Sequence, residues 1–373
     1  MIHSFQYEDL NGNLSGTLSF NSQLNIFTGQ NGTGKTSILK ALWYLYSGNL
    51  NQLLGEMNFS RLTLSSDAAD ATVQQYRENE ESVYSISVTR KDSLGDRFSN
   101  LLGTKPLAGT WSEIESNLWK CSFALGIGPH SLFFPTFRRV EGGFSIHKTR
   151  TLRSQGLAID NETELTKALR TISDKLNNME HKFICSVSTT DVERLVLEHK
   201  SSIDSRQKSE YENLAENISL TIREWQSSSA KLGADLVLNQ ILKKVSLTEV
   251  ERDKISKPLG LLAKEVSSYF PNRSIKIRDI KIDNNNNEIE INSEILSAGE
   301  KQLLSFLCYA TFCSDHVVMI DEPELSLHLD WQRKLIRSLT SLNTTNQYFF
   351  VTHSPAIYAK YSDFEINLSN PKH

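Results

Sequence analysis

The apolar positions of this chain change their spacing along its length, and this change predicts the order of its elements. Residues 2–27 form short strand-like runs broken by Asn-rich turns, and they end in a continuous apolar run. Residues 35–46 then carry apolar side chains at spacings of three and four, and Gly48 follows where a helix C-cap is expected. The pattern predicts a strand, a loop and a helix of about three turns in direct succession.

Further strands are indicated by the alternation at 84–89 and by the apolar run 132–140, which Pro135 interrupts. Residues 275–282 and 288–291 also alternate, and they flank an Asn-rich stretch typical of a hairpin turn. These patterns predict an antiparallel β-region in addition to the strand before residue 29.

A helical period dominates residues 161–225. One apolar series has heptad-like spacing: Leu165, Leu169, Ile172, Leu176, Met179 and Phe183. It covers fewer than three heptads, or about 30 Å of helix, so we expect a compact, short coiled-coil-like hairpin and not a long arm.

Composition narrows the class of protein. The 373 residues allow two or three domains, and 40 Lys plus Arg against 44 Asp plus Glu give a net charge of -4, so a protein-wide basic footprint for nucleic acid is absent. The four Cys residues lack the paired spacing of a zinc site or redox dithiol and are expected to be buried thiols. Neither a signal-peptide pattern nor a run of about 20 apolar residues occurs, so we expect a cytoplasmic protein without membrane contact.

Eight consecutive residues match the phosphate-binding P-loop pattern G-x-x-x-x-G-K-[ST]: Gly29, Gln30, Asn31, Gly32, Thr33, Gly34, Lys35 and Thr36. They lie between the predicted strand and helix, where backbone N–H groups and a helix N-terminus can bind an anion. We expect this loop and the following Ser37 to bind ATP, Lys35 to reach the β- and γ-phosphates, and the Thr36 hydroxyl to bind Mg²⁺.

A second motif joins an apolar run at 317–320 to two carboxylates, Asp321 and Glu322. Charges at the carboxyl end of a buried strand belong at a ligand crevice. Asp321 is expected to hold Mg²⁺ and Glu322 to activate the attacking water. The alternative is a solvated acidic pair, which the upstream P-loop makes less favourable.

Two further segments could contact phosphates. Ser297 and Glu300 form a capping box that opens a helix, which is an ordinary helix start but also an N-terminus able to bind an anion. His353 follows the strand-like residues 348–351 and is a candidate γ-phosphate sensor, although a lone His is usually structural.

Together the motifs resemble those of ABC-type P-loop ATPases. The Ser of an LSxGE-type signature lies 24 residues before the first residue of the Asp-Glu pair (297 to 321), and a His lies 32 residues after that residue (321 to 353). The sequences DEPELSLH at 321–328 and FPTFRR at 134–139 resemble the branch that holds RecF, the structural-maintenance-of-chromosomes proteins and the OLD-family defence ATPases.

This resemblance implies an α/β nucleotide-binding domain with a mixed sheet, an antiparallel subdomain and a helical insertion. We expect the ATPase domain at 1–154 and 273–373 and the insertion at 155–272. The resemblance further implies a head-to-tail dimer or higher oligomer around ATP and Mg²⁺, with Ser297 and Gly299 acting in trans.

Departures from the pattern refine the resemblance. His328 stands where transporters carry the D-loop Asp, which is similar to the OLD-type branch and argues against a transporter subunit. OLD-type proteins append a Toprim nuclease, whereas 20 residues follow His353 here, too few for such a domain. Any nuclease is therefore expected on a separate subunit.

A local surplus of positive charge lies between 138 and 153. Its members are Arg138, Arg139, Lys148, Arg150 and Arg153. Three interpretations remain: contact with DNA or RNA, contact with a partner protein, or a solvated surface.

Three functions follow. The first is an ATP-hydrolysing switch or sensor of an anti-phage defence system that acts with a separate effector, a nuclease or toxin. The second is a RecF-like DNA-repair ATPase that clamps DNA. The third is a nucleotide-dependent scaffold for a partner, against which Glu322 argues because binding alone needs no water-activating carboxylate.

Overall fold

The chain forms two compact units, Met1–Val187 with Cys313–His373 (unit 1) and Ser188–Phe312 (unit 2), and each is described by itself. The computed structural model describes residues 1–78, 81–91, 107–110, 128–136, 139–140, 164–187, 189–227, 234–271, 274–277, 280–282, 288–290 and 296–369.

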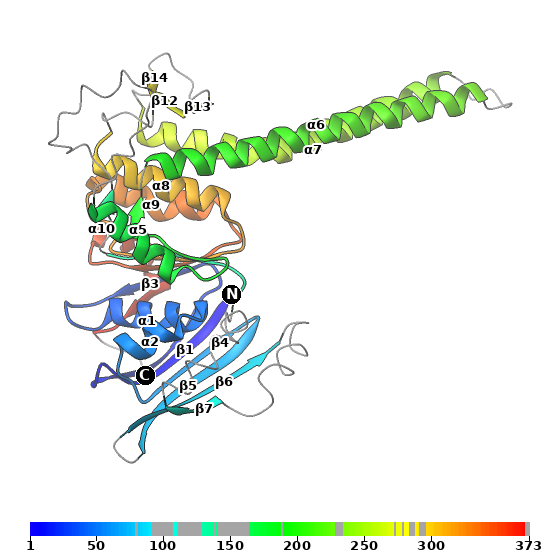
Figure 1. Ribbon diagram of the computed structural model, residues 1–373. Helices are drawn as coiled ribbons and strands as arrows, with labels where there is room; N and C mark the ends of the chain where they lie inside the picture. The colour runs from blue at the N-terminus through cyan, green and yellow to red at the C-terminus, as the bar shows by residue number, and fades with distance from the viewer. Residues whose placement is uncertain are drawn as a thin grey trace, which may run out of the picture. The chain divides into compact units, whose positions relative to one another are not determined.

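A six-stranded sheet in which all neighbours run parallel forms the centre of unit 1 (Figure 1). Its order is β10 (His181–Phe183), β8 (Ser131–Phe134), β15 (Val317–Asp321), β16 (Gln347–Val351), β3 (Leu24–Thr28) and β17 (Glu365–Asn367). Every residue of β3, β15 and β16 is buried, as expected for parallel strands covered on both faces.

A second, antiparallel sheet completes the β-structure of unit 1. Its order is β2 (Leu14–Ser19), β1 (Ile2–Leu10), β4 (Arg61–Ser66), β5 (Ala69–Glu78), β6 (Glu81–Arg90) and β7 (Leu107–Thr110). Tyr84 and Ile86 of β6 are buried while Ser87 is exposed, which confirms the predicted alternation. The predicted α/β P-loop fold with an additional antiparallel sheet and helical insertion is thus confirmed.

Helix α1 (Lys35–Ser47) contacts both sheets, through β15 and β16 on one and β4 on the other. Its residues 41–46 are all buried, because a helix covered on several sides has no solvent-facing stripe. The indole of Trp43 donates a hydrogen bond to Ser131 Oγ at 3.0 Å. Gly48 adopts φ 74° and ends the helix where the sequence predicted. Three further helices of unit 1 are α2 (Leu50–Glu56), α9 (Leu329–Leu342) and α10 (Pro355–Tyr358).

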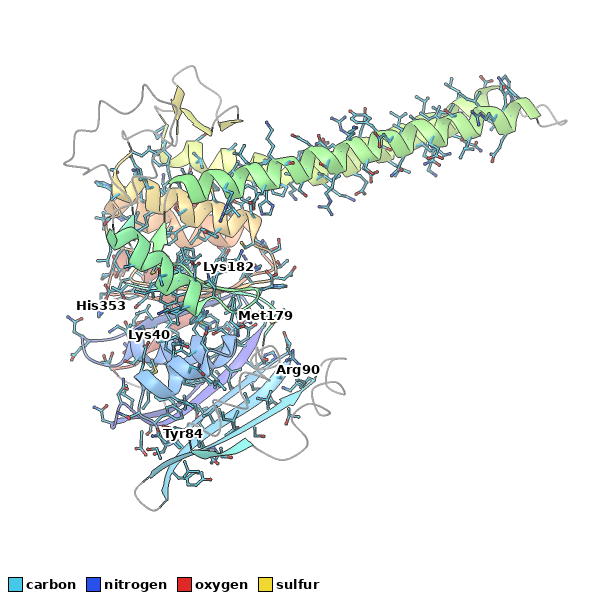
Figure 2. All side chains as sticks on the ribbon, viewed as in Figure 1. Lys40, Tyr84, Arg90, Met179, Lys182 and His353 are labelled. Atoms are coloured by element: carbon cyan, nitrogen blue, oxygen red, sulfur yellow. The ribbon has the colours of Figure 1, made fainter. Side chains whose placement is uncertain are left out.

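The heptad-like series predicted as one helix divides between a helix and a strand. Helix α5 (Glu164–Leu176) ends before Met179, which has φ 53° and is 59% exposed (Figure 2). Phe183 lies in β10, where its N–H donates to the side chain of Asn177. Leu169, Leu176 and Phe183 are buried in the core of unit 1, whereas Ile172 and Met179 are exposed, so the spacing reflected neither a continuous helix nor the burial of every member.

Two long helices dominate unit 2: α6 (Thr189–Ser227) and α7 (Ala234–Tyr269) lie side by side along their length (Figure 1). Helix α6 has 39 residues, or ~58 Å at 1.5 Å per residue. The expectation of a short hairpin was therefore wrong for these helices. Helix α8 (Ala298–Phe312) contacts both of them, and the Phe312 ring stacks on His199.

The apolar pattern of the sequence did not predict the length of these helices, because the line of residues along which they contact each other (the contact seam) is partly polar. The less exposed positions of α6 recur at spacings of three and four: Val192, Val196, His199, Ile203, Gln207, Glu210, Leu214, Ile218 and Thr221. The Lys244 ammonium donates to the Thr221 hydroxyl at 2.9 Å, and the Arg252 guanidinium lies 4.6 Å from the centre of the Tyr211 ring. A search for apolar side chains alone misses such a seam.

Unit 2 spans Ser188–Phe312, whereas the sequence predicted the insertion at 155–272. Helix α5 contributes to the core of unit 1, and α8 packs on α6 and α7. Limits of compact units and of independently folding domains need not coincide, so the predicted domain limits stay a prediction.

The predicted hairpin at 275–291 has a different pairing. Strand β12 (Ser274–Ile277) pairs antiparallel with β13 (Ile280–Ile282) and parallel with β14 (Glu288–Glu290). Strand β12 is therefore the middle strand of this sheet, and β13 and β14, which flank the Asn-rich stretch in the sequence, lie on either side of it and run in opposite directions.

Two expectations from composition can be compared with the described residues. Cys185, Cys308 and Cys313 are buried free thiols, as predicted, and Cys121 lies outside those residues. Within the described part of the chain, none of the helices has both the length and the apolar character needed to cross a bilayer.

Candidate functional site

The parallel sheet brings the predicted motifs to one edge. Strands β3, β15 and β16 are neighbours that run in the same direction, so the segments after Thr28, Asp321 and Val351 meet at their carboxyl ends. A cavity of about 680 Å³ opens there. It is lined by the P-loop, by the segment after β15 and by the loop after β16: Asn31, Gly32, Gly34, Lys35, Thr36, Ser37, Glu322, Glu324, Leu325 and His353.

The P-loop backbone depends on its glycines. Gly34 immediately precedes α1 and has φ 82°, a conformation that side chains disfavour. A Cβ on Gly34 would also lie 2.2 Å from Cδ1 of Leu14. This position therefore needs glycine for its backbone angle, and an added Cβ would also displace the Leu14 side chain of β2.

The Lys35 ammonium folds back onto its own loop. Its Nζ donates to the carbonyl oxygens of Gln30 at 2.7 Å and Gly29 at 3.0 Å. Burial lowers the pKa of Lys35, and the Glu322 and Asp321 carboxylates oppose this shift. Lys35 thus lines the cavity as a cation close to both carboxylates of the second motif.

Asp321 joins the P-loop to the second motif. It is fully buried, and its Oδ1 accepts a hydrogen bond from the Thr36 hydroxyl at 3.2 Å. Its Oδ2 accepts a hydrogen bond from the hydroxyl of Thr136, two residues after β8. Two hydroxyls from distant segments therefore hold this carboxylate beside the P-loop.

Glu322 leaves the strand in an unusual conformation. Its φ of 48° is in the left-handed region, and its N–H donates to the carbonyl oxygen of Val351 at 2.8 Å. This bond ties the residue to the neighbouring strand β16. Glu322 lines the cavity, and its predicted role beside the phosphates stays a prediction.

His353, labelled in Figure 2, follows β16, is exposed and lines the same cavity. Its backbone N–H donates to Oε1 of Glu324 at 2.7 Å. The imidazole is therefore on a loop whose backbone is fixed while its ring faces solvent. Such a placement leaves the ring available to a ligand.

Comparison with known proteins agrees with this geometry. The sequence profile of the family described as "AAA ATPase domain" matches residues 13–358. This chain belongs to the AAA ATPase domain family.

Two solved structures are similar to this AAA ATPase domain. One is an Smc head bound to the C-winged helix domain of ScpA, with 11% identity, a TM-score of 0.39, and 96% and 91% of the two chains covered. The other is an Smc head domain with an extended coiled coil bound to the C-terminal domain of ScpA derived from Pyrococcus furiosus, with 14% identity, a TM-score of 0.34 and the same coverage.

The residues of this AAA ATPase domain suit ATP and Mg²⁺. Mg²⁺ is commonly held by one or two carboxylates together with substrate phosphates and water, and the oxygens of Thr36 and Asp321 beside the P-loop are of the hard type that would hold it. Among the described residues, no three His, Cys, Asp or Glu side chains group as a metal site, so a protein-only cage is not seen in that part of the chain.

Two residues of the site were missed from the sequence. Thr136 belongs to the quoted FPTFRR segment but had no assigned role, and Glu324 is the second Glu of DEPELSLH. The signal for both was their position just after the carboxyl end of a strand, since β8 ends at Phe134 and β15 at Asp321. Neither has a motif spacing that marks it.

Ser297 and Gly299 belong to unit 2 and form the predicted helix start. The Ser297 N–H donates to Glu300 Oε2 at 2.7 Å, and the Glu300 N–H donates to Ser297 Oγ at 3.3 Å, so the capping box is present. Their action in trans stays a prediction.

The basic surplus lies outside the residues whose side chains are described. Arg138, Lys148, Arg150 and Arg153 are not described, and Arg139 is placed as backbone in β9 (Arg139–Val140), which pairs with β11 (Ser186–Val187). All three interpretations of the surplus stay open.

Proposed function

We propose that this protein hydrolyses ATP with Mg²⁺ at the cavity of unit 1. One observation carries the proposal: the Thr36 hydroxyl of the P-loop lies 3.2 Å from the Asp321 carboxylate, at the edge of a cavity lined by Lys35, Glu322 and His353. The arrangement brings oxygen ligands for a metal, a cation for phosphate and a carboxylate for water activation to one place.

Each side chain has a separate role in this proposal. The P-loop amides and Lys35 bind the phosphates, which requires the Lys35 ammonium to leave its carbonyl partners. Glu322 accepts the proton of the attacking water, and His353 contacts the γ-phosphate from the loop after β16. Mg²⁺, when bound at Thr36 and Asp321, neutralises the charge that develops on the phosphate oxygens.

We further propose that two copies bind ATP head to tail, so that Ser297 and Gly299 of one copy contact the phosphates held by the other. The capping box supports this, because it presents a helix N-terminus with a defined geometry. The self-association is then ATP-dependent.

Replacing Glu322 with Gln tests the enzymatic proposal. Because the amide cannot accept the proton, we expect kcat to fall about 10²- to 10⁴-fold while ATP still binds and the dimer persists. The matched control is Glu8→Gln on β1, outside the cavity, with wild-type turnover. Unchanged turnover in Glu322→Gln would remove the assignment of Glu322.

For the biological role, we propose a switch or sensor subunit of an anti-phage defence system that acts with a separate effector. The support is the resemblance of DEPELSLH at 321–328 to OLD-type ATPases. Co-expression with neighbouring genes, followed by mass measurement with and without ATP and Mg²⁺, tests for the effector. ATPase stimulation by double-stranded DNA in a salt-dependent manner, without such a partner, would instead support the RecF-like alternative.

A further inference from the structure

Two side chains tie the loop that carries His353 to the segment that follows Glu322. Oε1 of Glu324 accepts the backbone N–H of His353 at 2.7 Å. The Ser354 hydroxyl donates to Oε1 of Gln332 at 2.6 Å, and Gln332 Nε2 donates to the carbonyl oxygen of Leu327 at 2.9 Å. The loops after β15 and β16 are therefore joined by side chains as well as by their neighbouring strands.

The segment that supplies Glu324 is itself tightly wound. Glu322 and Ser326 have positive φ values of 48° and 67°, although neither is glycine. The Leu325 N–H donates to the Glu322 carbonyl at 3.3 Å, and the Leu327 N–H donates to the Glu324 carbonyl at 3.0 Å. Such conformations persist only where surrounding contacts hold them.

The two oxygens of Glu324 have different surroundings. Oε1 makes the bond to His353, whereas Oε2 is buried and has no hydrogen-bond partner among the described residues. A bond from a backbone N–H to a carboxylate is stronger than one between neutral groups. Glu324 therefore restrains the backbone of His353 strongly while its other oxygen stays uncommitted beside the cavity.

We propose that Glu324 and Gln332 are positioning residues that set where His353 lies relative to Glu322. This inference rests on the proposed ATP hydrolysis. His353 and Glu322 both line the cavity, on segments that follow the neighbouring strands β16 and β15. Each is anchored through its backbone N–H, Glu322 to Val351 and His353 to Glu324. Loss of the Glu324 bond frees the His353 loop but leaves the P-loop unchanged, so it slows turnover more than it weakens nucleotide binding.

Kinetics of Glu324→Ala, Glu324→Gln and Gln332→Ala test the proposal. We expect Glu324→Ala to lower kcat about ten- to hundredfold with KM changed less than about threefold. Glu324→Gln should restore most of the activity, because its amide oxygen can accept the same N–H. Gln332→Ala should have a smaller effect of the same kind, and Glu8→Ala on β1 should have none.

Hydrogen exchange of the His353 amide provides a readout that does not depend on catalysis. Exchange should be faster in Glu324→Ala and close to wild type in Glu324→Gln, with unchanged melting temperatures. Wild-type kcat in Glu324→Ala would overturn the proposal. Equal loss of activity in both Glu324 variants would also overturn it, since the carboxylate would then act in the chemistry.

The two proposals can fail separately. If the wild-type protein hydrolyses ATP no faster than the Lys35→Ala variant, the proposed function is wrong. The exchange measurement would still show whether Glu324 restrains the His353 loop. Normal exchange at His353 in Glu324→Ala would reject the positioning role whatever the ATPase result.

Discussion

The hydroxyl of Thr36 and the carboxylate of Asp321 lie 3.2 Å apart, although 285 positions separate them along the chain. The parallel pairing of β3 with β16 and of β16 with β15 creates this proximity. The second oxygen of Asp321 accepts a hydrogen bond from Thr136. The orientation of the proposed Mg²⁺ ligand thus depends on three segments of unit 1.

Thr136→Ala is expected to weaken Mg²⁺ use. Without the Thr136 hydroxyl, Asp321 loses one of two partners that orient it, so the Mg²⁺ concentration for half-maximal ATPase activity should rise about three- to tenfold, or ~1 kcal/mol. Thr136→Ser keeps the hydroxyl and should behave as wild type. A Mg²⁺ titration at saturating ATP measures the effect, and identical curves for Ala and Ser would contradict it.

Lys35→Ala is expected to weaken ATP binding itself. The ammonium makes charge-assisted bonds to phosphates, so its loss should raise the Kd for ATP at least about tenfold, or ~1.4 kcal/mol. Lys40→Ala is a matched control, since Lys40 lies on the same helix but pairs with Glu56 at 3.9 Å (Figure 2). Calorimetric titration with ATP measures both. Equal affinities for the two variants would be incompatible with the P-loop interpretation.

Gly34→Ala is expected to destabilise the fold. The change adds a Cβ at φ 82°, 2.2 Å from Leu14 Cδ1, and should lower the free energy of unfolding by ~1 to 3 kcal/mol. Gly32 has the same φ but open space around it, so Gly32→Ala should show the cost of the backbone angle alone. In denaturant unfolding, Gly34→Ala should have a lower free energy of unfolding than Gly32→Ala. Adding Leu14→Ala to the Gly34→Ala variant should bring the two free energies closer together.

The stability of unit 1 should decrease in acid through His181. Burial, the largest cause, lowers the pKa of His181 from 6.5 to about 4, while its Nδ1 lies 2.8 Å from Ser131 Oγ. The unfolded chain therefore binds the proton more readily. The contribution of neutral His181 to the free energy of unfolding is complete above about pH 6.5. It is lost as the pH falls toward 4, which lowers this free energy by at most ~3 kcal/mol.

His181→Asn provides the comparison for this pH dependence. Asn removes the ionisable ring, so the free energy of unfolding should vary less between pH 6.5 and 4 than in the wild type. Denaturant unfolding at a series of pH values measures both slopes. Equal slopes for the two proteins would show that His181 does not control this part of the profile.

The sequence predicted the parts of the site that have a fixed local spacing. The P-loop from Gly29 to Thr36 and the Asp321-Glu322 pair combine a motif with a strand, so their meeting at one sheet edge could be expected. Thr136 and Glu324 could not be assigned, because their roles come from hydrogen bonds across distant segments. The spacing of residues along the sequence does not reveal contacts between distant segments.

The helices of unit 2 illustrate a different limit. Gln207, Glu210 and Thr221 occupy seam positions that an apolar pattern does not detect. Conversely, Leu176 and Phe183 share a heptad spacing but lie in a helix and a strand. Periodicity therefore identified only some of the side chains that become buried, and the same spacing can arise from different backbone structures.

Strand β3 lies between β16 and β17, both of which are made more than 300 residues after it. During translation, both hydrogen-bonding edges of β3 therefore lack their native partner strands until these have been synthesised. At about 5 to 20 residues per second, that interval is roughly 15 to 60 s. A growing chain with a complete P-loop sequence thus lacks the sheet that shapes it, and its apolar β3 is open to wrong pairing until β16 and β17 have been synthesised.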